Sequence, residues 1–268
     1  MREFAGAQAV VGGLLDLVLP KRCVACGRAG AWLCDACARE LHPLPDERCW
    51  HCGAPARPHV SGCRECRERT LWFVTAGAAF TYDGAAKALV TACKFRAYRS
   101  VVDEMVGLAR PAFAAAAARL GDDPRARAAD PKLLVTWVPG HRDHVLERGF
   151  NQAEGLARGL ARATGLPCAP LLERVRHGAR QSGLGRHARA ANVSQSFAVR
   201  EDAERVVRMF KRVMIVDDVY TTGETLSHGA EVLINTGLEP HTFTFARTVR
   251  AVPSQNTIDA AVRKERCR

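Results

Sequence analysis

Blocks of apolar residues recur along the longer, C-terminal part of the chain, and their spacing predicts strands that alternate with helices. Residues 213–216 are four apolar residues in a row, which predicts a strand buried on both faces, as in a parallel sheet. Further predicted strands are residues 74–82, 133–138, 171–172 and 242–245. The predicted helices are residues 85–95, residues 100–120, and a segment through Leu156 and Leu160 that Gly165 ends. This order predicts an α/β domain with a mainly parallel sheet flanked by helices, in which residues 213–216 form a central strand.

Two carboxylates, Asp217 and Asp218, follow this strand, and a turn with two threonines and one glycine comes next. Apolar residues then continue at helical spacing at Leu226, Ala230, Leu233 and Ile234. Backbone N–H groups and threonine hydroxyls at the start of a helix can hold a phosphate. Carboxylates repel phosphate, so their natural partners are ribose hydroxyls and Mg²⁺, and the sequence predicts a sugar-phosphate site. The alternative is that the two acids merely end a core strand and a threonine caps the helix.

Four Cys-x-x-Cys pairs lie within the first 66 residues, at Cys23/Cys26, Cys34/Cys37, Cys49/Cys52 and Cys63/Cys66. Two such pairs complete a tetrahedral tetracysteine site, so eight ligands predict two structural Zn²⁺ ions. Pairing of consecutive motifs is the simplest arrangement, and interleaved pairing stays open. A redox role for one pair is the alternative, and four pairs in a row argue against it. Thiols kept for metal predict a reducing, cytoplasmic location.

The net charge of +11 favours anionic partners, namely pyrophosphate, nucleotides or nucleic acid. No run of ~20 uncharged apolar residues occurs, so no membrane span is expected. The apolar stretch 10–19 predicts a short amphipathic helix that packs on the body. No acid occurs between Arg174 and Arg200, and the glycines there predict a mobile basic loop. Lys94 lies near the end of a predicted helix, where the helix dipole favours a cation.

Residues 213–225 resemble the signature of type I phosphoribosyltransferases, which bind phosphoribosyl pyrophosphate (PRPP). The resemblance implies that Asp217 and Asp218 contact the ribose hydroxyls and favour the positive charge that develops on the sugar during transfer. It also implies a loop for the 5′-phosphate made of Thr221, Thr222, Gly223, Glu224 and Thr225. Mg²⁺, Arg148 and the basic-loop residues Arg180 and Arg189 would then neutralise the departing pyrophosphate.

A wider set of residues resembles the ComF family of phosphoribosyltransferase-like proteins, and the resemblance runs nearly from end to end. The first block is Val138-Pro139, Arg142, Arg148-Gly149-Phe150-Asn151-Gln152 and Leu156-Ala157. The second block is Arg180-Gln181-Ser182, Leu184, Arg189, Asn192 and Phe197. The cysteine pairs look like the double zinc ribbon that often precedes this domain, whereas Gly140-His141 stands where relatives tend to carry a bulkier residue. The family implies a cytoplasmic protein linked to natural competence that acts on incoming single-stranded DNA and meets competence-machinery proteins.

The chain is therefore expected to divide into residues 1–70, with an N-terminal helix and a double zinc ribbon, and residues 71–268, a type I phosphoribosyltransferase-like domain. One expected function is an enzyme that binds PRPP and Mg²⁺ and transfers phosphoribose to a nitrogen nucleophile. The acceptor is open, because no residue stands out as a determinant of base specificity. The alternatives are a PRPP sensor without turnover and an adaptor that grips single-stranded DNA through the zinc ribbons and the arginines.

Overall fold

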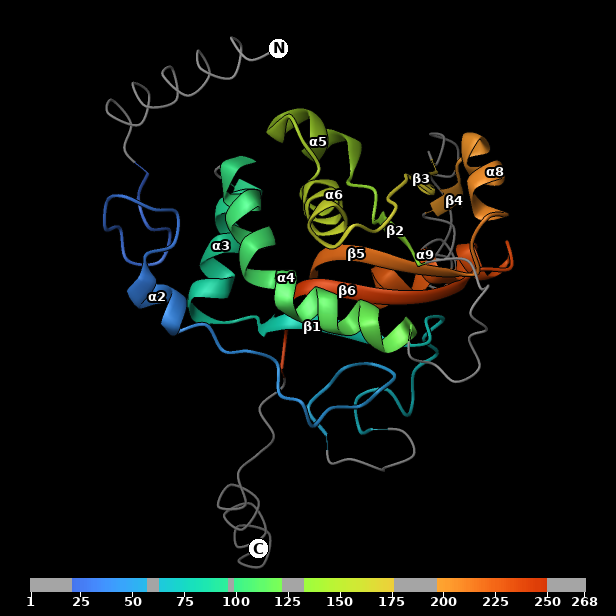
Figure 1. Cartoon of the computed structure of the whole chain (residues 1–268), viewed down its shortest axis with the longest axis horizontal. Helices are drawn as coiled ribbons and strands as arrows, with labels where there is room; N and C mark the ends of the chain where they lie inside the picture. Colours follow the sequence, from blue (N-terminus) through green and yellow to red (C-terminus); the bar gives the residue numbers. More distant parts are fainter. Residues whose placement is uncertain (1–20, 57–62, 96–98, 122–132, 176–196, 250–268) are drawn as a thin grey trace, which may run out of the picture.

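The structure, a computed structural model, describes residues 21–56, 63–95, 99–121, 133–175 and 197–249 (Figure 1). The expected helix at 10–19, the tail from residue 251, and most of the basic segment, including Arg180 and Arg189, lie outside these described residues.

A four-stranded sheet forms the centre of the fold, and all of its pairings are parallel. The strand order is β1-β6-β5-β2. These strands are β1 (Ala76–Thr81), β2 (Leu134–Trp137), β5 (Arg212–Tyr220) and β6 (Glu239–Arg247). The predicted parallel α/β architecture is confirmed, and the strand that carries the two acids is central, between β6 and β2.

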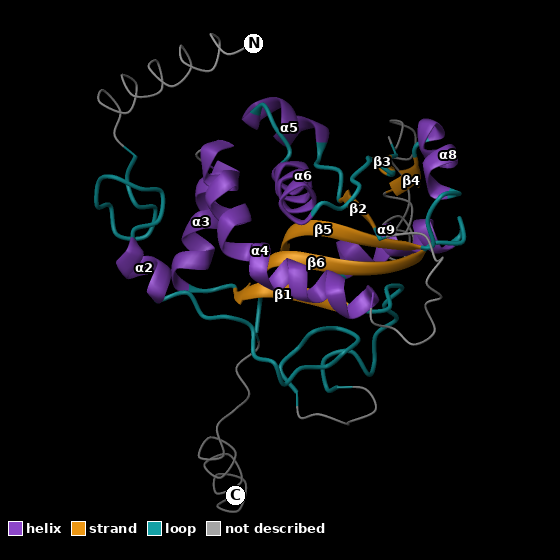
Figure 2. Cartoon of the chain, viewed as in Figure 1, coloured by secondary structure: helices purple, strands orange, loops and turns teal. Residues whose placement is uncertain are grey.

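Helices cover both faces of this sheet (Figure 2). On one face lie α3 (Gly84–Phe95), α4 (Arg99–Gly121) and α6 (Gln152–Thr164), and on the other lies α9 (Glu224–Ile234). Alternate residues of β5 serve the two faces, because Met214 and Val216 pack with the three helices, whereas Val213 and Ile215 pack with α9. This double burial explains the uninterrupted apolar run that predicted the strand.

Several short elements differ from the sequence expectation. The helix α5 (Arg142–Arg148) was not predicted, and β5 continues four residues beyond the expected end at residue 216. The ends of the basic segment are ordered rather than a loop, because β3 (Leu172–Arg174) and β4 (Phe197–Val199) pair as a separate antiparallel sheet. Ile234, expected on the apolar face of its helix, is 38% exposed. The remaining described helices are the single turns α2 (Asp35–Arg39), η1 (Glu201–Ala203) and α8 (Glu204–Val207).

The cysteine-rich region forms two lobes that attach to the sheet at different places. The first lobe is residues 21–41, and the second lobe is the described part of residues 45–70. The linker between them follows the outer edge of β1, where the Leu44 N–H donates to Ala79 O (3.0 Å) and the Thr81 N–H donates to His42 O (2.9 Å). In Figure 1 the first lobe lies beside α3 and the second lies beyond β1. Both lobes therefore pack against the α/β part of the chain, around the edge strand β1.

No helix in the part of the chain that the structure describes is long and apolar enough to cross a membrane.

Candidate functional site

The two acids lie near the carboxyl end of β5 and face different neighbours. Asp218, 7% exposed, continues the face of Met214 and Val216 and meets Lys94 at the end of α3, with 3.0 Å between Lys94 Nζ and Asp218 Oδ1. Asp217 is half-buried, and its Oδ1 accepts the Asp218 N–H at 2.8 Å. Its carboxylate is therefore held against the backbone of the next residue.

Asp217 holds its proton more tightly than an ordinary carboxyl group. Burial and the neighbouring charge of Asp218 raise the pKa of Asp217 to about 7, against the opposing effects of the Asp218 N–H, Lys94 and Arg174. A nearby cation or hydroxyl donors would stabilise the charged form of this carboxylate. The residues therefore fit a Mg²⁺ ion or the hydroxyls of a sugar, which would supply the positive charge or the protons that this pair lacks.

The loop after β5 has the shape of a cradle whose floor is the Tyr220 ring. Gly223 stands at φ +81° as the residue before α9, and a Cβ there would lie 2.4 Å from the Tyr220 hydroxyl oxygen. Only glycine therefore fits between the loop and its floor. The start of the loop is held by Thr248, whose hydroxyl donates to Thr221 O at 3.2 Å. It ends at the amino terminus of α9, where backbone N–H groups and the helix dipole favour an anion.

Of the three arginines predicted to face pyrophosphate, only Arg148 lies in the described residues. Arg148 is half-buried at the end of α5, which follows β2, the neighbour of β5, and no contact joins it to the acids in the described residues. Gly140 fits tightly at the turn before α5, since a Cβ there would approach the Val145 side chain to 2.8 Å.

The sequence analysis did not identify two basic residues beside the acids, Lys94 and Arg174, as site residues. Lys94 was interpreted as a charge at a helix end, and Arg174 as part of a loop. Arg174 instead lies in β3, where its Nε donates to Pro139 O at 2.8 Å and its guanidinium lies 4.9 Å from the centre of the Phe197 ring. Its charge, like that of Lys94, acts to lower the pKa of Asp217. A basic residue next to a predicted strand was the available signal for Arg174, and no local signal existed for Lys94.

The eight cysteines gather into two clusters built from consecutive motifs, which settles the pairing that their spacing left open. The sulfur atoms within each cluster all lie within 4.8 Å of one another. The members are Cys23, Cys26, Cys34 and Cys37 in the first lobe, and Cys49, Cys52, Cys63 and Cys66 in the second. A tetrahedral Zn²⁺ at ~2.3 Å from each sulfur needs sulfur pairs about 3.8 Å apart. The pairs Cys49–Cys66 at 3.8 Å and Cys26–Cys34 at 3.6 Å are consistent with two zinc sites.

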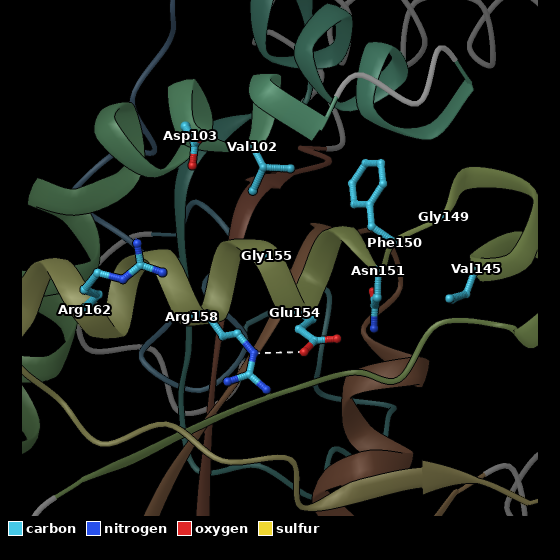
Figure 3. Close-up of a pocket in the computed structure, with 10 residues that line it drawn as sticks. All are labelled: Val102, Asp103, Val145, Gly149, Phe150, Asn151, Glu154, Gly155, Arg158 and Arg162. Atoms are coloured by element: carbon cyan, nitrogen blue, oxygen red, sulfur yellow. Dashed lines mark hydrogen bonds and ion pairs between the residues drawn. The ribbon is translucent and has the colours of Figure 1, made fainter. Parts of the chain in front are cut away.

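A hollow lies beside α6, away from the acids (Figure 3). It has a volume of about 590 Å³, and its charged lining residues are Asp103, Glu154, Arg158 and Arg162. Arg158 is already engaged, because its Nε donates to Glu154 at 2.8 Å and its guanidinium stacks 4.7 Å from the Trp137 ring. None of residues 217–225 lines this cavity, so it is separate from the sugar-phosphate cradle.

Comparison with known proteins gives matches to the cysteine-rich region and to most of the chain. The model of the double zinc ribbon domain matches residues 14–67. The chain is 28% identical to competence protein F of Haemophilus influenzae over 211 residues, which cover 77% of this chain and 86% of that protein. It is 25% identical to competence protein ComFC of Bacillus subtilis, covering 76% of this chain and 79% of that protein. The chain is therefore similar to competence proteins of the ComF type over most of its length.

Two solved structures align with part of the chain, each at a low score. Orotate phosphoribosyltransferase from Aeropyrum pernix aligns at 18% identity and a TM-score of 0.28, covering 66% of this chain and 71% of that one. The allosteric regulatory enzyme of purine biosynthesis aligns at 21% identity and a TM-score of 0.30, covering 51% of this chain. The match spans only 25% of the length of that enzyme. Scores this low transfer neither substrate nor activity.

Proposed function

We propose that this protein binds PRPP together with Mg²⁺ at the carboxyl edge of β5. The observation that carries the proposal is the loop of residues 221–225, in which Gly223 closes on Tyr220, close after two crowded carboxylates in the sequence. Asp217 and Asp218 would hold the ribose hydroxyls and Mg²⁺, and the loop would hold the 5′-phosphate. Arg148, with Arg180 and Arg189 from the segment outside the described residues, would face the pyrophosphate.

Turnover would then be transfer of phosphoribose to a nitrogen nucleophile. The bond from C1 of the sugar to the pyrophosphate oxygen breaks, and a bond from C1 to nitrogen forms, while the leaving group takes the electron pair. The protein would contribute orientation of the sugar and stabilisation of its developing positive charge by the two carboxylates. Mg²⁺, when bound, would offset the charge of the leaving pyrophosphate. A cytoplasmic location belongs to the same proposal, because thiolate metal sites suit a reducing compartment.

Isothermal titration calorimetry with Mg²⁺ and PRPP tests the binding part. The double variant Asp217→Asn with Asp218→Asn should lose binding and remain folded, since these carboxylates oppose each other and contribute little to packing. An unchanged PRPP affinity in the double variant would refute the assignment of the acids. Release of pyrophosphate with a panel of nitrogen bases then separates an enzyme from a sensor.

A second candidate function is contact with single-stranded DNA through the second lobe. Two tryptophans are exposed in and beside this lobe: Trp50 at 68% and, just after its last residue, Trp72 at 42%. Exposed aromatic rings on a basic protein offer stacking surfaces for unpaired bases. Replacing both tryptophans with Ala should weaken binding of an oligonucleotide and leave PRPP affinity intact. Equal DNA affinity of the variant would exclude this surface.

A further inference from the structure

The second lobe touches the rim of the phosphate cradle through Arg69. The Arg69 guanidinium donates from Nη2 to the carbonyl oxygen of Thr222, and the same nitrogen lies 3.8 Å from a carboxylate oxygen of Glu224. Thr222 lies 153 residues further along the chain, so this contact joins two regions that are distant in sequence. A guanidinium that holds the Thr222 carbonyl fixes the orientation of this peptide group within the loop.

The second lobe also supports the floor of the cradle, through Glu65. Its Oε2 accepts from Arg247 Nη2 at 2.8 Å, and Arg247 is only 2% exposed. The Arg247 guanidinium stacks on Tyr220, with its central carbon 4.0 Å from the ring centre. Tyr220 is the ring against which Gly223 closes. A buried arginine with one carboxylate partner depends strongly on that partner, so Glu65 helps to fix the floor.

Both contacts flank one metal ligand. Glu65 precedes Cys66 directly, and Arg69 follows it by three residues in a turn whose Arg69 N–H donates to Cys66 O at 3.1 Å. Metal binding and local folding are coupled in small cysteine sites, because the ligands converge only around the ion. Whatever orders Cys66 therefore orders the rim contact and the floor contact together.

We propose that the second lobe is a working part of the phosphate site: Arg69 is a positioning residue for the loop 221–225, and metal in the second cluster strengthens binding of the sugar phosphate. This inference rests on the proposed PRPP site and adds a partner to it. Coupling of this kind is reciprocal, so the bound sugar phosphate also strengthens retention of the second-lobe metal.

The experiment compares Arg69→Ala with Arg67→Ala in the full-length zinc-loaded protein. Arg67 is exposed in the same lobe, so its loss removes the same charge without touching the loop. Calorimetry with Mg²⁺ and PRPP should give a dissociation constant about tenfold higher for Arg69→Ala, within the usual range of coupling between sites. Arg67→Ala should match the wild type, and Arg69→Lys, which keeps a donor for the Thr222 carbonyl, should recover part of the loss.

Hydrogen exchange of residues 221–225 without ligand separates failure of this inference from failure of the proposed function. Arg69→Ala should speed exchange in this loop, and Arg67→Ala should leave it unchanged. If the wild type does not bind PRPP but exchange in this loop is faster in Arg69→Ala, the proposed ligand is wrong and the positioning role of Arg69 is supported. If the wild type binds PRPP and Arg69→Ala equals Arg67→Ala in affinity and exchange, the inference is overturned.

Discussion

The two cysteine lobes share one design and attach to the sheet in different ways. The first lobe merges with the large core, since Cys23, Cys34 and Cys37 belong to the same apolar cluster as α3, α4 and α6. The second lobe keeps a small core of its own and reaches the phosphate loop through charged side chains. One lobe is therefore joined by apolar packing and the other by polar contacts to the candidate site. The same metal chemistry can thus serve stability in one place and ligand binding in another.

The route from each lobe to the acids differs as well. The first lobe packs on α3, whose last turn carries Lys94 toward Asp218, so its influence passes through a helix. The second lobe contacts the loop directly. Loss of metal from the second lobe should disturb the large core less than loss from the first lobe, because the first lobe contributes its own cysteines to that core.

Removing the metal from one lobe at a time should produce the largest difference. Cys49→Ser with Cys52→Ser should weaken PRPP binding by about tenfold or more, because the contacts beside Cys66 lose their anchor. Cys23→Ser with Cys26→Ser should instead lower the melting temperature and keep the affinity of the folded protein. Calorimetry and thermal unfolding of both variants measure this, and the reverse pattern would contradict the division of roles.

The two knuckle glycines give a matched pair for stability. Gly27 and Gly53 both follow the second cysteine of a motif and have φ of +79° and +72°. A Cβ at Gly27 would meet open space, whereas at Gly53 it would lie 2.6 Å from Ala76 O at the start of β1. Gly53→Ala should therefore cost about 1–3 kcal/mol more than Gly27→Ala. Urea unfolding of the two variants decides it, and equal costs would show that the second lobe is not pressed against the sheet.

Lys94 tests the indirect route through α3. Lys94→Met leaves the carboxylate of Asp218 buried without this cation, and the free energy of unfolding should fall by about 1–2 kcal/mol, less than for a fully buried pair. Lys87 lies exposed on the same helix, so Lys87→Met is the control. Urea titration of both proteins gives the comparison. A Lys94→Met protein as stable as its control would mean that the ion pair contributes nothing.

Asp217→Asn should have the smallest effect and a distinctive pH dependence. Because the folded pKa of Asp217 is raised to about 7, the folded state binds more protons than the unfolded state, and stability falls as pH rises from about 4 to 7. Removing the charge should raise the melting temperature at pH 8 by about 2–4 °C, or ~1 kcal/mol, and change little at pH 4. Thermal scans at the two pH values check this, and an equal shift at both would rule out relief of charge.

The sequence predicted the elements whose signals are local. The run at 213–216, the acids and the Thr-Thr-Gly turn lie within thirteen residues, so strand, loop and helix α9 could be placed by pattern alone. Gly165 ended α6 as expected, with φ of 72°. The seven-residue helix α5 has no buried residue, so no apolar period marked it.

The parts that the sequence missed are contacts between distant segments. Lys94 meets Asp218, and Arg69 meets Thr222, across more than a hundred residues, and neither contact leaves a periodic trace. Spacing within a Cys-x-x-Cys motif also says nothing about which motif is its partner. Folding decides these pairings through the path of the linker along β1, which separates the first two motifs from the last two.

The coupling between the second lobe and the sugar-phosphate site is tested most directly by the rate at which each lobe loses zinc to a zinc-selective chelator, with and without Mg²⁺ and PRPP. Variants that keep a single cluster, Cys23→Ser with Cys26→Ser or Cys49→Ser with Cys52→Ser, report on one lobe each. PRPP should slow zinc loss from the second lobe several-fold and leave the first lobe unchanged, because binding and metal retention are linked. Bound PRPP with unchanged zinc loss from the second lobe would contradict it.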